Sequence, residues 1–271
     1  MKRPVIFTDL DGTLLDSGTY SFSAALPALM ELKKRDIPLV ICSSKTRVEI
    51  EHWRAKLGNG HPFISENGGG IFIPKGYFDG YFDTGITAVE SGDYQVIALG
   101  AEYSKLREAV TALKTRFKIR GFGDMTIEEL MKLANMGGRE AEMAKEREFD
   151  EPFISDGTAD ELSKLLSEIE AMGFRHTQGR FFHIMGDSDK GKAVRILKGL
   201  YRKKYGEITT VALGDSPNDI EMLQSVNYPV VVMRPDVTHD SRIEVPNLVK
   251  ANGVGPKGWN IAVMEFLGKL Q

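Results

Sequence analysis

Short apolar runs and longer amphipathic segments alternate along the first part of the chain. Each apolar run leads directly into polar residues, as buried parallel strands do where they enter a loop. These runs predict strands at residues 4–8, 39–42, 63–65 and 71–73. The segments between them predict helices at residues 25–32 and 48–57. This alternation indicates a parallel, doubly wound, Rossmann-like α/β sheet.

The pattern changes between about residue 80 and about residue 185, where amphipathic helices dominate and the strands are weak. One helix is predicted by the spacing of the apolar residues Leu106, Val110, Leu113 and Phe117. Two others begin with capping boxes, which pair Thr126 with Glu129 and Thr158 with Glu161. No run in this part has the continuous apolar character of a buried parallel strand, so a different, α+β type of fold is expected here.

The α/β pattern resumes in the last third of the chain. It predicts a helix at residues 194–200, strands at 210–213 and 230–232, and a helix near 261–267. A core pattern that is interrupted by a different one indicates an inserted domain. We therefore expect a core of residues 1–83 and 187–271, with residues 84–186 inserted as an α+β cap. A length of 271 residues suits two such domains.

The composition is that of a folded globular protein, with 42% hydrophobic and 27% charged residues. A formal net charge of −3 argues against a nucleic-acid partner, which requires a broad basic face. No stretch approaches the roughly 20 apolar residues of a membrane helix, and the apolar run before Asp9 is too short for a signal peptide. The single cysteine, Cys42, excludes an internal disulfide and fits a cytoplasmic location. The oligomeric state, monomer or dimer, stays open.

Three of the predicted strands end in residues with reactive side chains. Asp9 and Asp11 follow the first strand, Ser43 follows the second, and Asp215 follows a later one. In open α/β sheets, ligands bind beyond the carboxyl ends of the strands, so we expect these side chains to converge on one crevice. Clustered carboxylates repel one another, and a cation with hard oxygen ligands such as Mg²⁺ removes that cost. A surface turn with solvated aspartates would explain the first pair alone, but not all three strand ends.

The loop after strand 210–213 has a structural explanation as well as a functional one. Ser216 suits a helix N-cap and Pro217 suits the first helical position. Asp219 then falls where a capping-box carboxylate would lie, so its role could be structural. Asp215 precedes the cap and has no such role, which makes it the better candidate for a metal ligand.

Two lysines lie ahead of the helix predicted at residues 194–200. Either Lys190 or Lys192 could place a positive charge against a phosphoryl group, because an ammonium group donates charge-assisted hydrogen bonds to phosphate oxygens. The alternative for both is a solvated surface lysine, and that alternative is the stronger one for Lys192.

Taken together, these residues resemble the haloacid dehalogenase superfamily of phosphatases. Its four motifs are matched in the right order by residues 9–13 (Asp-Leu-Asp-Gly-Thr), Ser43, Lys190 and residues 214–219 (Gly-Asp-Ser-Pro-Asn-Asp). The inserted segment is similar to the large α/β cap of the sugar-phosphatase branch of that superfamily. Five further runs resemble the members of this branch that act on mannosyl-3-phosphoglycerate, and they are residues 42–46, 65–68, 147–153, 179–183 and 255–259.

The resemblance implies a division of catalytic roles. Asp9 is expected to attack the phosphorus as nucleophile and to form an aspartyl-phosphate. Asp11 is expected to protonate the leaving alcohol and then to activate the water that hydrolyses this intermediate. Ser43 and Lys190 are expected to hold the phosphoryl oxygens and to offset their charge.

The resemblance also implies Mg²⁺ as the cofactor. The expected ligands are the carboxylates of Asp9 and Asp215 and the backbone carbonyl of Asp11. Asp219 is expected to support either the metal site or Lys190. Such a cation would lower the repulsion between an attacking carboxylate and a phosphate dianion.

The expected partner is a small sugar phosphate, whose phosphate, carboxylate and sugar ring would each need contacts. The signals for these contacts are the neighbours of Ser43 and the charged residues in the second half of the insertion. The candidates are Ser44, Lys45, Arg147, Glu151, Arg180 and His183. For each of them the alternative is a solvated side chain or an intramolecular salt bridge.

Two other functions remain open from the sequence. The substrate could be another sugar phosphate, such as glucosyl-3-phosphoglycerate or sucrose phosphate. The chain could also be a non-catalytic regulator that binds a sugar phosphate on the same fold. The presence of both Asp9 and Asp11 counts against a regulator, because a protein that only binds has no need of a nucleophile and an acid together.

Overall fold

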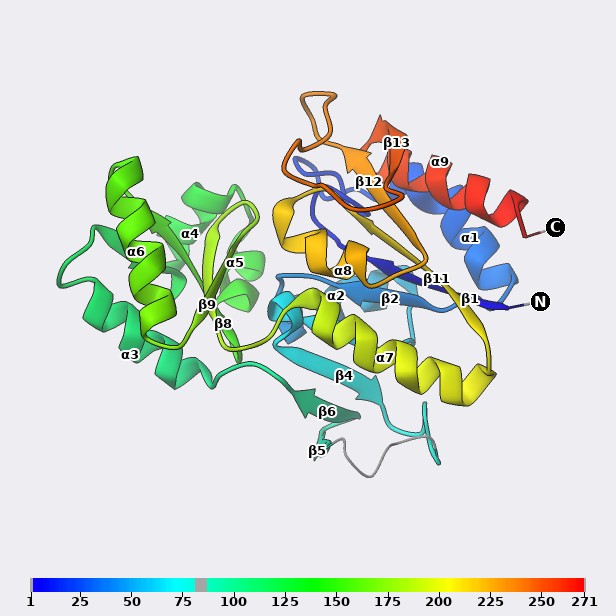
Figure 1. Ribbon diagram of the computed structural model, residues 1–271, viewed down its shortest axis with the longest axis horizontal. Helices are drawn as coiled ribbons and strands as arrows, with labels where there is room; N and C mark the ends of the chain where they lie inside the picture. The colour runs from blue at the N-terminus through cyan, green and yellow to red at the C-terminus, as the bar shows by residue number, and fades with distance from the viewer. Residues whose placement is uncertain (1, 81–86, 271) are drawn as a thin grey trace.

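The computed structural model describes residues 2–80 and 87–270, which form a core domain and a cap domain (Figure 1). The core contains a nine-stranded sheet and lies on the right in Figure 1, where both ends of the chain are found. The cap is built from the middle of the chain around a four-stranded sheet and lies on the left. The chain therefore enters the cap from the core and returns to it, as expected for an inserted domain.

The core sheet has the strand order β13-β12-β11-β1-β2-β3-β4-β6-β5. Neighbouring strands from β13 to β3 are parallel, and β4, β6 and β5 extend the sheet beyond β3 as antiparallel strands. The strands are β1 (Arg3–Thr8), β2 (Leu39–Cys42), β3 (Phe63–Ser65), β4 (Gly70–Pro74), β5 (Val89–Ser91), β6 (Tyr94–Ala98), β11 (Ile208–Gly214), β12 (Tyr228–Met233) and β13 (Val249–Val254). The predicted parallel α/β sheet is confirmed.

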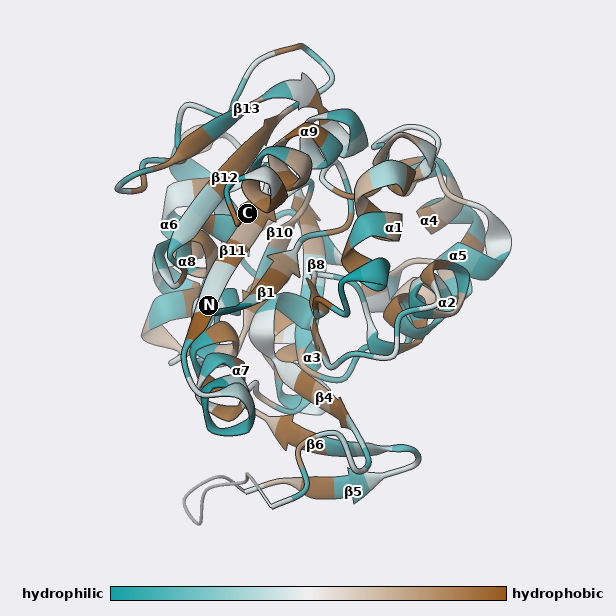
Figure 2. Cartoon of the chain, turned by 90° about the vertical axis from the view of Figure 1, so that its right-hand side faces the viewer, coloured by the Kyte–Doolittle hydropathy of each residue, from teal (hydrophilic) through white to brown (hydrophobic). Residues whose placement is uncertain are grey.

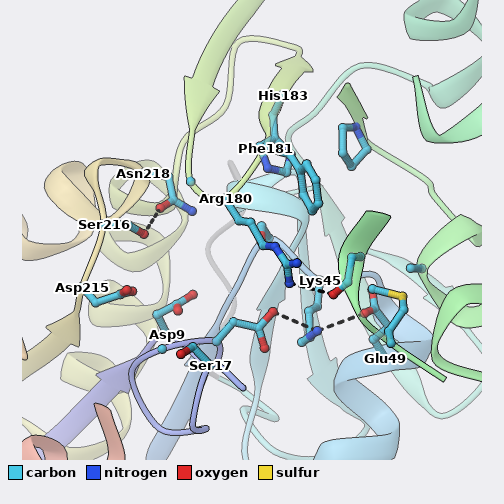
Figure 3. A pocket seen from close by; sticks show the side chains of 18 of the residues that line it. Asp9, Ser17, Lys45, Glu49, Arg180, Phe181, His183, Asp215, Ser216 and Asn218 are labelled. Atoms are coloured by element: carbon cyan, nitrogen blue, oxygen red, sulfur yellow. Dashed lines mark hydrogen bonds and ion pairs between the residues drawn. The ribbon is translucent and has the colours of Figure 1, made fainter. Parts of the chain in front are cut away.

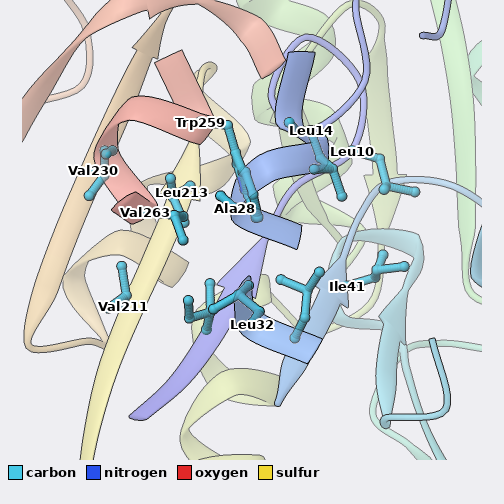
Figure 4. Close-up of a cluster of buried hydrophobic side chains, with 14 of the residues drawn as sticks. Leu10, Leu14, Ala28, Leu32, Ile41, Val211, Leu213, Val230, Trp259 and Val263 are labelled. Carbon is cyan, nitrogen blue, oxygen red and sulfur yellow. The ribbon is translucent and has the colours of Figure 1, made fainter. Parts of the chain in front are cut away.

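Helices cover both faces of the core sheet, with α1, α2 and α9 on one face and α7 and α8 on the other. Their bounds are α1 (Leu26–Lys34), α2 (Arg47–Leu57), α7 (Lys190–Tyr205), α8 (Ile220–Gln224) and α9 (Gly255–Gly268). Side chains of β1 alternate between the faces, so Ile6 packs with α1 and α9 while Phe7 packs with α7. Figure 4 shows the hydrophobic cluster between the sheet and helices α1 and α9, around Trp259, which is fully buried. In Figure 2, β12 is predominantly hydrophobic, whereas α7 carries both polar and apolar residues.

The cap sheet has the order β7-β8-β10-β9, and each of these pairs is antiparallel. Helices α3 and α6 pack on one face against Phe153 and Ile184, and α4 and α5 form a smaller cluster with Phe122 and Phe181. The elements are β7 (Ile119–Gly121), β8 (Asp150–Ser155), β9 (Arg175–Gln178), β10 (Phe182–Met185), α3 (Tyr103–Leu113), α4 (Ile127–Ala134), α5 (Gly138–Lys145) and α6 (Ala159–Ala171). The predicted α+β character of the insertion is confirmed.

Short 3-10 helices lie at the junctions of these elements: η1 (Ser23–Ala25), η2 (Glu66–Gly68), η3 (Phe122–Asp124) and η4 (Pro217–Asp219). Both predicted capping boxes of the cap are confirmed, because Thr126 and Thr158 each accept a hydrogen bond from the backbone at the third helical position. The last helix begins at Gly255, earlier than its apolar pattern indicated. Strand β13 before it was not predicted.

The cap begins later in the chain than expected. The predicted boundary between residues 83 and 84 lies outside the described residues. Strands β5 and β6, which follow it, pair with each other and with β4, so they belong to the core sheet and the prediction that placed them in the cap is wrong. Most side chains of β5 and β6 are exposed or half-buried, which explains why their pattern did not resemble a core strand. The second predicted boundary, between residues 186 and 187, falls between β10 and α7.

Phe149, just before β8, packs closely on three glycines where the cap meets the core. A Cβ atom at Gly70 would lie 2.7 Å from Cε2 of Phe149, and one at Gly100 would lie 2.8 Å from its Cβ. A Cβ at Gly69 would also collide with the Cβ of Phe149. Real Cβ atoms do not approach other atoms so closely, so these positions need glycine to let the aromatic side chain approach the backbone.

Candidate active site

The polar residues at the strand ends lie in and around one crevice of the core. Asp9 follows β1, Ser43 follows β2 and Asp215 follows β11, and these three strands are neighbours in the sheet. Lys190, the first residue of α7, donates hydrogen bonds to Asp9 Oδ1 and to Asp219 Oδ1, both at 2.7 Å. Its side chain is fully buried, so the ammonium group is committed to these two carboxylates.

Three carboxylates meet at this place, because oxygens of Asp9, Asp215 and Asp219 all lie within 4.8 Å of one another. Burial raises the pKa of Asp9 to about 7, against the opposing effect of the neighbouring Lys190. Burial, together with the charges of Asp219 and Asp9, also raises the pKa of Asp215 well above its usual value. One lysine therefore does not balance the negative charge of the cluster.

The donor set fits Mg²⁺. The ligand atoms on offer are hard carboxylate oxygens, and their burial and mutual repulsion disfavour their charged forms, a cost that a bound cation would offset. Both oxygens of Asp219 are already engaged, one with Lys190 and the other with the backbone N–H groups of Asp215 and Ser216. Asp219 thus has the predicted place of a supporting residue, and Asp9 and Asp215 offer freer oxygens. Ligation by the backbone carbonyl of Asp11 stays a prediction.

Asp11 lies at the edge of this cluster and is paired with Lys45. Lys45 Nζ is 2.9 Å from Asp11 Oδ2 and 3.1 Å from Glu49 Oε1, and its side chain is buried between them. The Oδ1 atom of Asp11 has no hydrogen-bond partner among the described residues. Lys45 was predicted to contact substrate, but in this structure its ammonium group is paired with Asp11 and Glu49 and holds Asp11 in place.

A cavity of about 380 Å³ opens over these residues, between the core and the cap. Its lining includes Asp9, Asp11, Ser44, Lys45 and Asp215 from the core and Arg147, Arg180 and His183 from the cap. Figure 3 shows Arg180 extending from the cap toward Lys45, with Asp9 and Asp215 on the other side. Ser43 and Lys190 are buried behind the lining, where Ser43 Oγ accepts a hydrogen bond from the backbone N–H of Lys45. The structure therefore brings most of the predicted site residues to one cavity.

Two of the predicted substrate-binding residues of the cap face this cavity. Arg180 donates hydrogen bonds to the backbone carbonyls of Ala134 and Leu133, at 2.7 and 3.4 Å, which hold its guanidinium group over the opening. His183 is nearly fully buried, and its Nδ1 lies 2.8 Å from Asp150 Oδ1. Both side chains therefore have fixed orientations before any ligand binds.

Arg147 lines the cavity but is used mainly to join the cap to the core. It donates one hydrogen bond to the backbone carbonyl of Ser44, at 2.8 Å, and another to the carbonyl of Ala144, at 2.9 Å. It also lies 3.6 Å from Asp150 Oδ1. The structure thus gives Arg147 an intramolecular role, which was the alternative to substrate binding.

Glu151 does not reach the cavity, so the prediction that it binds substrate is not supported by its position. Its carboxylate is fully buried in the cap and accepts hydrogen bonds from Tyr103, Arg107 and the backbone N–H of Gly123. The physical reason is the alternation along β8, where Asp150 faces the core and Glu151 faces the interior of the cap.

Several cavity-lining residues were not indicated by the sequence pattern. They are Tyr20, Glu49, Asn218, Arg234 and Arg242. A signal was available for Arg234, which directly follows β12 just as Asp9 follows β1. A local signal was also available for Glu49, which completes a capping box with Thr46 at the start of α2. Asn218 lies within the matched motif of residues 214–219 but was given no role there. Tyr20 and Arg242 lie in loops, whose conformation has no such signal.

The family of this chain follows from comparison with known proteins. A model of the haloacid dehalogenase-like hydrolase family matches residues 6–85 and 140–236, which is more than half of the chain. The chain belongs to this family. Within residues 2–80 and 87–270, no helix is long and apolar enough to cross a membrane.

Particular relatives are more specific. The chain is 47% identical over 270 residues to a protein of Methanococcoides burtonii named glucosyl-3-phosphoglycerate/mannosyl-3-phosphoglycerate phosphatase, with 98% of each chain covered. It is 40% identical over 229 residues to a mannosyl-3-phosphoglycerate phosphatase of Pyrococcus horikoshii, covering 84% of this chain and 90% of that protein. Among solved structures, a protein of Thermoplasma acidophilum shares the fold, with a TM-score of 0.71, 18% identity and coverage of 98% of this chain and 99% of that one.

Proposed function

We propose that the protein is a Mg²⁺-dependent phosphatase that hydrolyses 2-O-(α-D-mannosyl)-3-phosphoglycerate to mannosylglycerate and phosphate through an aspartyl-phosphate. The observation that carries the proposal is the position of Asp9, which lies on the cavity floor between Lys190 and the carboxylate of Asp215. The names of the relatives with 47% and 40% identity support the substrate. A cytoplasmic location belongs to the same proposal.

Asp9 acts as the nucleophile. A carboxylate that attacks a phosphate dianion meets strong repulsion, which positive charge at the same place reduces. Lys190 contributes such a charge at Asp9 Oδ1, and Mg²⁺ held by Asp9 and Asp215 would supply the rest of the charge stabilisation when bound. Ser43 Oγ accepts a hydrogen bond from Lys45, so its own hydroxyl hydrogen remains for a phosphoryl oxygen.

Asp11 acts as the general acid and then as the general base. Lys45 holds its Oδ2 atom, and Oδ1 is buried and has no hydrogen-bond partner among the described residues, so the carboxyl group has a fixed orientation at the edge of the cavity. Glu49 binds the other side of the Lys45 ammonium group and so keeps the lysine in place. The ion pair thus fixes the position of the Asp11 carboxyl group next to Asp9.

Arg180 and His183 recognise the non-reacting part of the substrate. Arg180 presents the cap's guanidinium group to the cavity, and guanidinium groups bind carboxylates with paired hydrogen bonds. The glycerate carboxylate is the matching group of the proposed substrate. Glucosyl-3-phosphoglycerate is a second candidate substrate, because the name of the Methanococcoides burtonii relative includes both sugars.

The test is phosphate release from a small panel of substrates, consisting of mannosyl-3-phosphoglycerate, glucosyl-3-phosphoglycerate, sucrose phosphate and p-nitrophenyl phosphate. We expect the highest kcat/KM with mannosyl-3-phosphoglycerate, and loss of turnover after chelation that Mg²⁺ restores. Faster turnover of sucrose phosphate would contradict the proposed substrate. Full activity after thorough chelation would contradict the role of the metal.

A further inference from the structure

Asn67 is a buried amide at the junction of the two domains, in a run of residues that the catalytic roles do not explain. It lies in η2 and is only 1% exposed. Its φ angle is +54°, in the left-handed region, which asparagine tolerates better than most residues other than glycine. A polar side chain that is buried in an unusual backbone conformation is held there by specific partners.

The partners of Asn67 come from both domains. Its Nδ2 donates to Asp150 Oδ2 of the cap strand β8, at 2.7 Å. Its Oδ1 accepts a hydrogen bond from Asn218 Nδ2, at 3.0 Å, and Asn218 belongs to η4 of the core. Asn67 therefore joins a strand of the cap to the loop that carries Asp215.

The hydrogen bonds continue at both ends of this pair. Asp150 Oδ1 lies 2.8 Å from His183 Nδ1, and a carboxylate accepts only, so Nδ1 carries the proton. This leaves Nε2 of His183 as the imidazole atom for a ligand, and no hydrogen bond of Nε2 occurs among the described residues. At the other end, Ser216 Oγ donates to Asn218 Oδ1 at 2.8 Å, one residue after Asp215.

The backbone around Asn67 is also fixed from both sides. The carboxyl group of Glu66 accepts hydrogen bonds from the backbone N–H groups of Glu148 and Phe149 in the cap. Gly68 has a φ angle of +93°, and a Cβ there would collide with the backbone of Asp189 and Lys190. Only glycine permits this approach, so η2 is held between the cap and the start of α7.

We infer that Asn67 is a positioning residue that sets the cap side chain His183 relative to the core loop bearing Asp215, by linking Asp150 to Asn218. This role rests on the proposed function, because it matters only for a substrate that contacts both domains. A small aryl phosphate needs the core residues alone. A phosphoglycerate ester that carries a sugar also needs the cap in register with them.

The test exchanges the amide of Asn67 and the carboxylate of Asp150, which form a buried hydrogen bond. Asn67→Asp places a carboxylate against Asp150, whereas the double variant Asn67→Asp/Asp150→Asn again gives a donor facing an acceptor. In the double variant the exchanged side chains can still accept from His183 Nδ1 and from Asn218 Nδ2. We expect Asn67→Asp to lower kcat/KM for mannosyl-3-phosphoglycerate by roughly tenfold or more, and the double variant to recover most of that loss.

The second substrate distinguishes positioning from a purely structural role. For p-nitrophenyl phosphate, we expect kcat/KM of Asn67→Asp to stay within about threefold of the wild type. Equal losses on both substrates, or no recovery in the double variant, would overturn the positioning role. If Asn67→Asp does not fold, Asn67→Gly answers the same question through the same ratio, because glycine accepts the φ angle and removes only the amide.

The matched control is Asn247→Gly. Asn247 has a φ angle of +59°, like Asn67, but it is exposed and lies in the core loop before β13. We expect both substrates to be turned over by this variant as by the wild type. The proposed function is tested separately, since it fails only if the wild type itself does not hydrolyse phosphoglycerate esters.

Discussion

The core side and the cap side of the cavity use their charged residues in different ways. On the core side, Asp9 and Lys190 are buried, Asp215 lies half-buried beside them, and their charges are poorly balanced without a cation. In the cap, Arg147 at the cavity wall and Glu151 in the interior of the domain have hydrogen bonds to other parts of the protein, and each is largely satisfied before any ligand binds. The core side is therefore built for chemistry, whereas much of the cap's polarity is used for its own structure and for its contact with the core.

This difference teaches how to weigh a polar residue near a cavity. A charged group that remains uncompensated in the folded protein is available to a ligand or a metal. A charged group whose partners are all supplied by the protein mainly stabilises the fold. Five substitutions test this contrast, in order of the expected size of their effects.

The largest effect is expected from Asp9→Asn. The amide keeps the shape of the side chain but cannot attack phosphorus, so kcat should fall by about four orders of magnitude or more. Stability should not fall, because the substitution removes a buried carboxylate whose pKa is already raised. Phosphate release and thermal unfolding measure the two effects. Asp187→Asn is the control, since its side chain is 85% exposed, and substantial turnover by Asp9→Asn would refute the nucleophile assignment.

The next effect is a loss of stability in Lys190→Met. Removal of the ammonium group leaves Asp9 and Asp219 buried without their cation, which should cost about 3–5 kcal/mol of unfolding free energy in the presence of a chelator. Urea denaturation measures it. Lys192→Met, two residues further along α7, is the matched control, because this lysine is 40% exposed and should change stability by less than about 0.5 kcal/mol. Similar losses in both variants would show that the buried charge cluster has no special weight.

Glu66, at the junction between the two sides, is expected to make stability depend on pH. Burial raises its pKa to about 8, so the folded protein keeps this carboxyl protonated at pH values where the unfolded chain ionises it. The stabilisation is present in full below the ordinary pKa of 4.5 and is lost as pH rises through about 8. Glu66→Gln mimics the protonated acid, so its stability relative to the wild type should increase between pH 5 and pH 8, by on the order of 2–4 kcal/mol.

Urea midpoints at a series of pH values measure this difference. Glu90→Gln is the control, because its side chain is 70% exposed and the difference from the wild type should not vary with pH. A constant difference for Glu66→Gln as well would mean that the carboxyl is ionised in the folded protein.

The smallest effects separate Arg180 from Glu151. Arg180→Ala should raise KM for mannosyl-3-phosphoglycerate by about 10- to 100-fold, the value of a charge-assisted hydrogen-bond pair, and leave KM for p-nitrophenyl phosphate nearly unchanged. Glu151→Gln should instead lower the unfolding free energy by about 1–3 kcal/mol with little change in KM. Steady-state kinetics and urea denaturation of both variants give the comparison. A selective KM increase in Glu151→Gln would restore it as a substrate ligand.

The parts of the site that the sequence predicted are those fixed by topology. Asp9, Ser43 and Asp215 each follow a strand of the parallel sheet, and the carboxyl ends of parallel strands lie at one edge. Asp219 also matched its predicted geometry, because a capping box is a local pattern over four residues. Local capping patterns and the topology of the parallel sheet were therefore enough to predict the core fold and the positions of its acidic residues.

The parts of the fold and site that were not predicted depend on which face of a weakly patterned strand each side chain occupies, and on contacts between residues far apart in the chain. One residue along β8 decides whether a side chain faces the core, as Asp150 does, or the cap interior, as Glu151 does, and this phase could not be read from a strand without clear alternation. The bond from Asn67 to Asp150 joins residues 83 positions apart, and no local pattern specifies it. Strand β13 buries Ala251 but leaves most of its residues exposed or half-buried, so it lacked the apolar run of the other strands.

The close packing of Phe149 on Gly69, Gly70 and Gly100 has a consequence for how such caps can be exchanged between relatives. The ring belongs to the inserted domain, but two of the glycines beneath it belong to the loop and strand of the host domain. A chimera that grafts a relative's cap onto this core would place a different side chain against Gly69 and Gly70. A chimera that grafts this cap onto a relative's core would place Phe149 against residues that need not be glycine. The unit that can be transplanted is therefore longer than the inserted domain and includes residues 66–70.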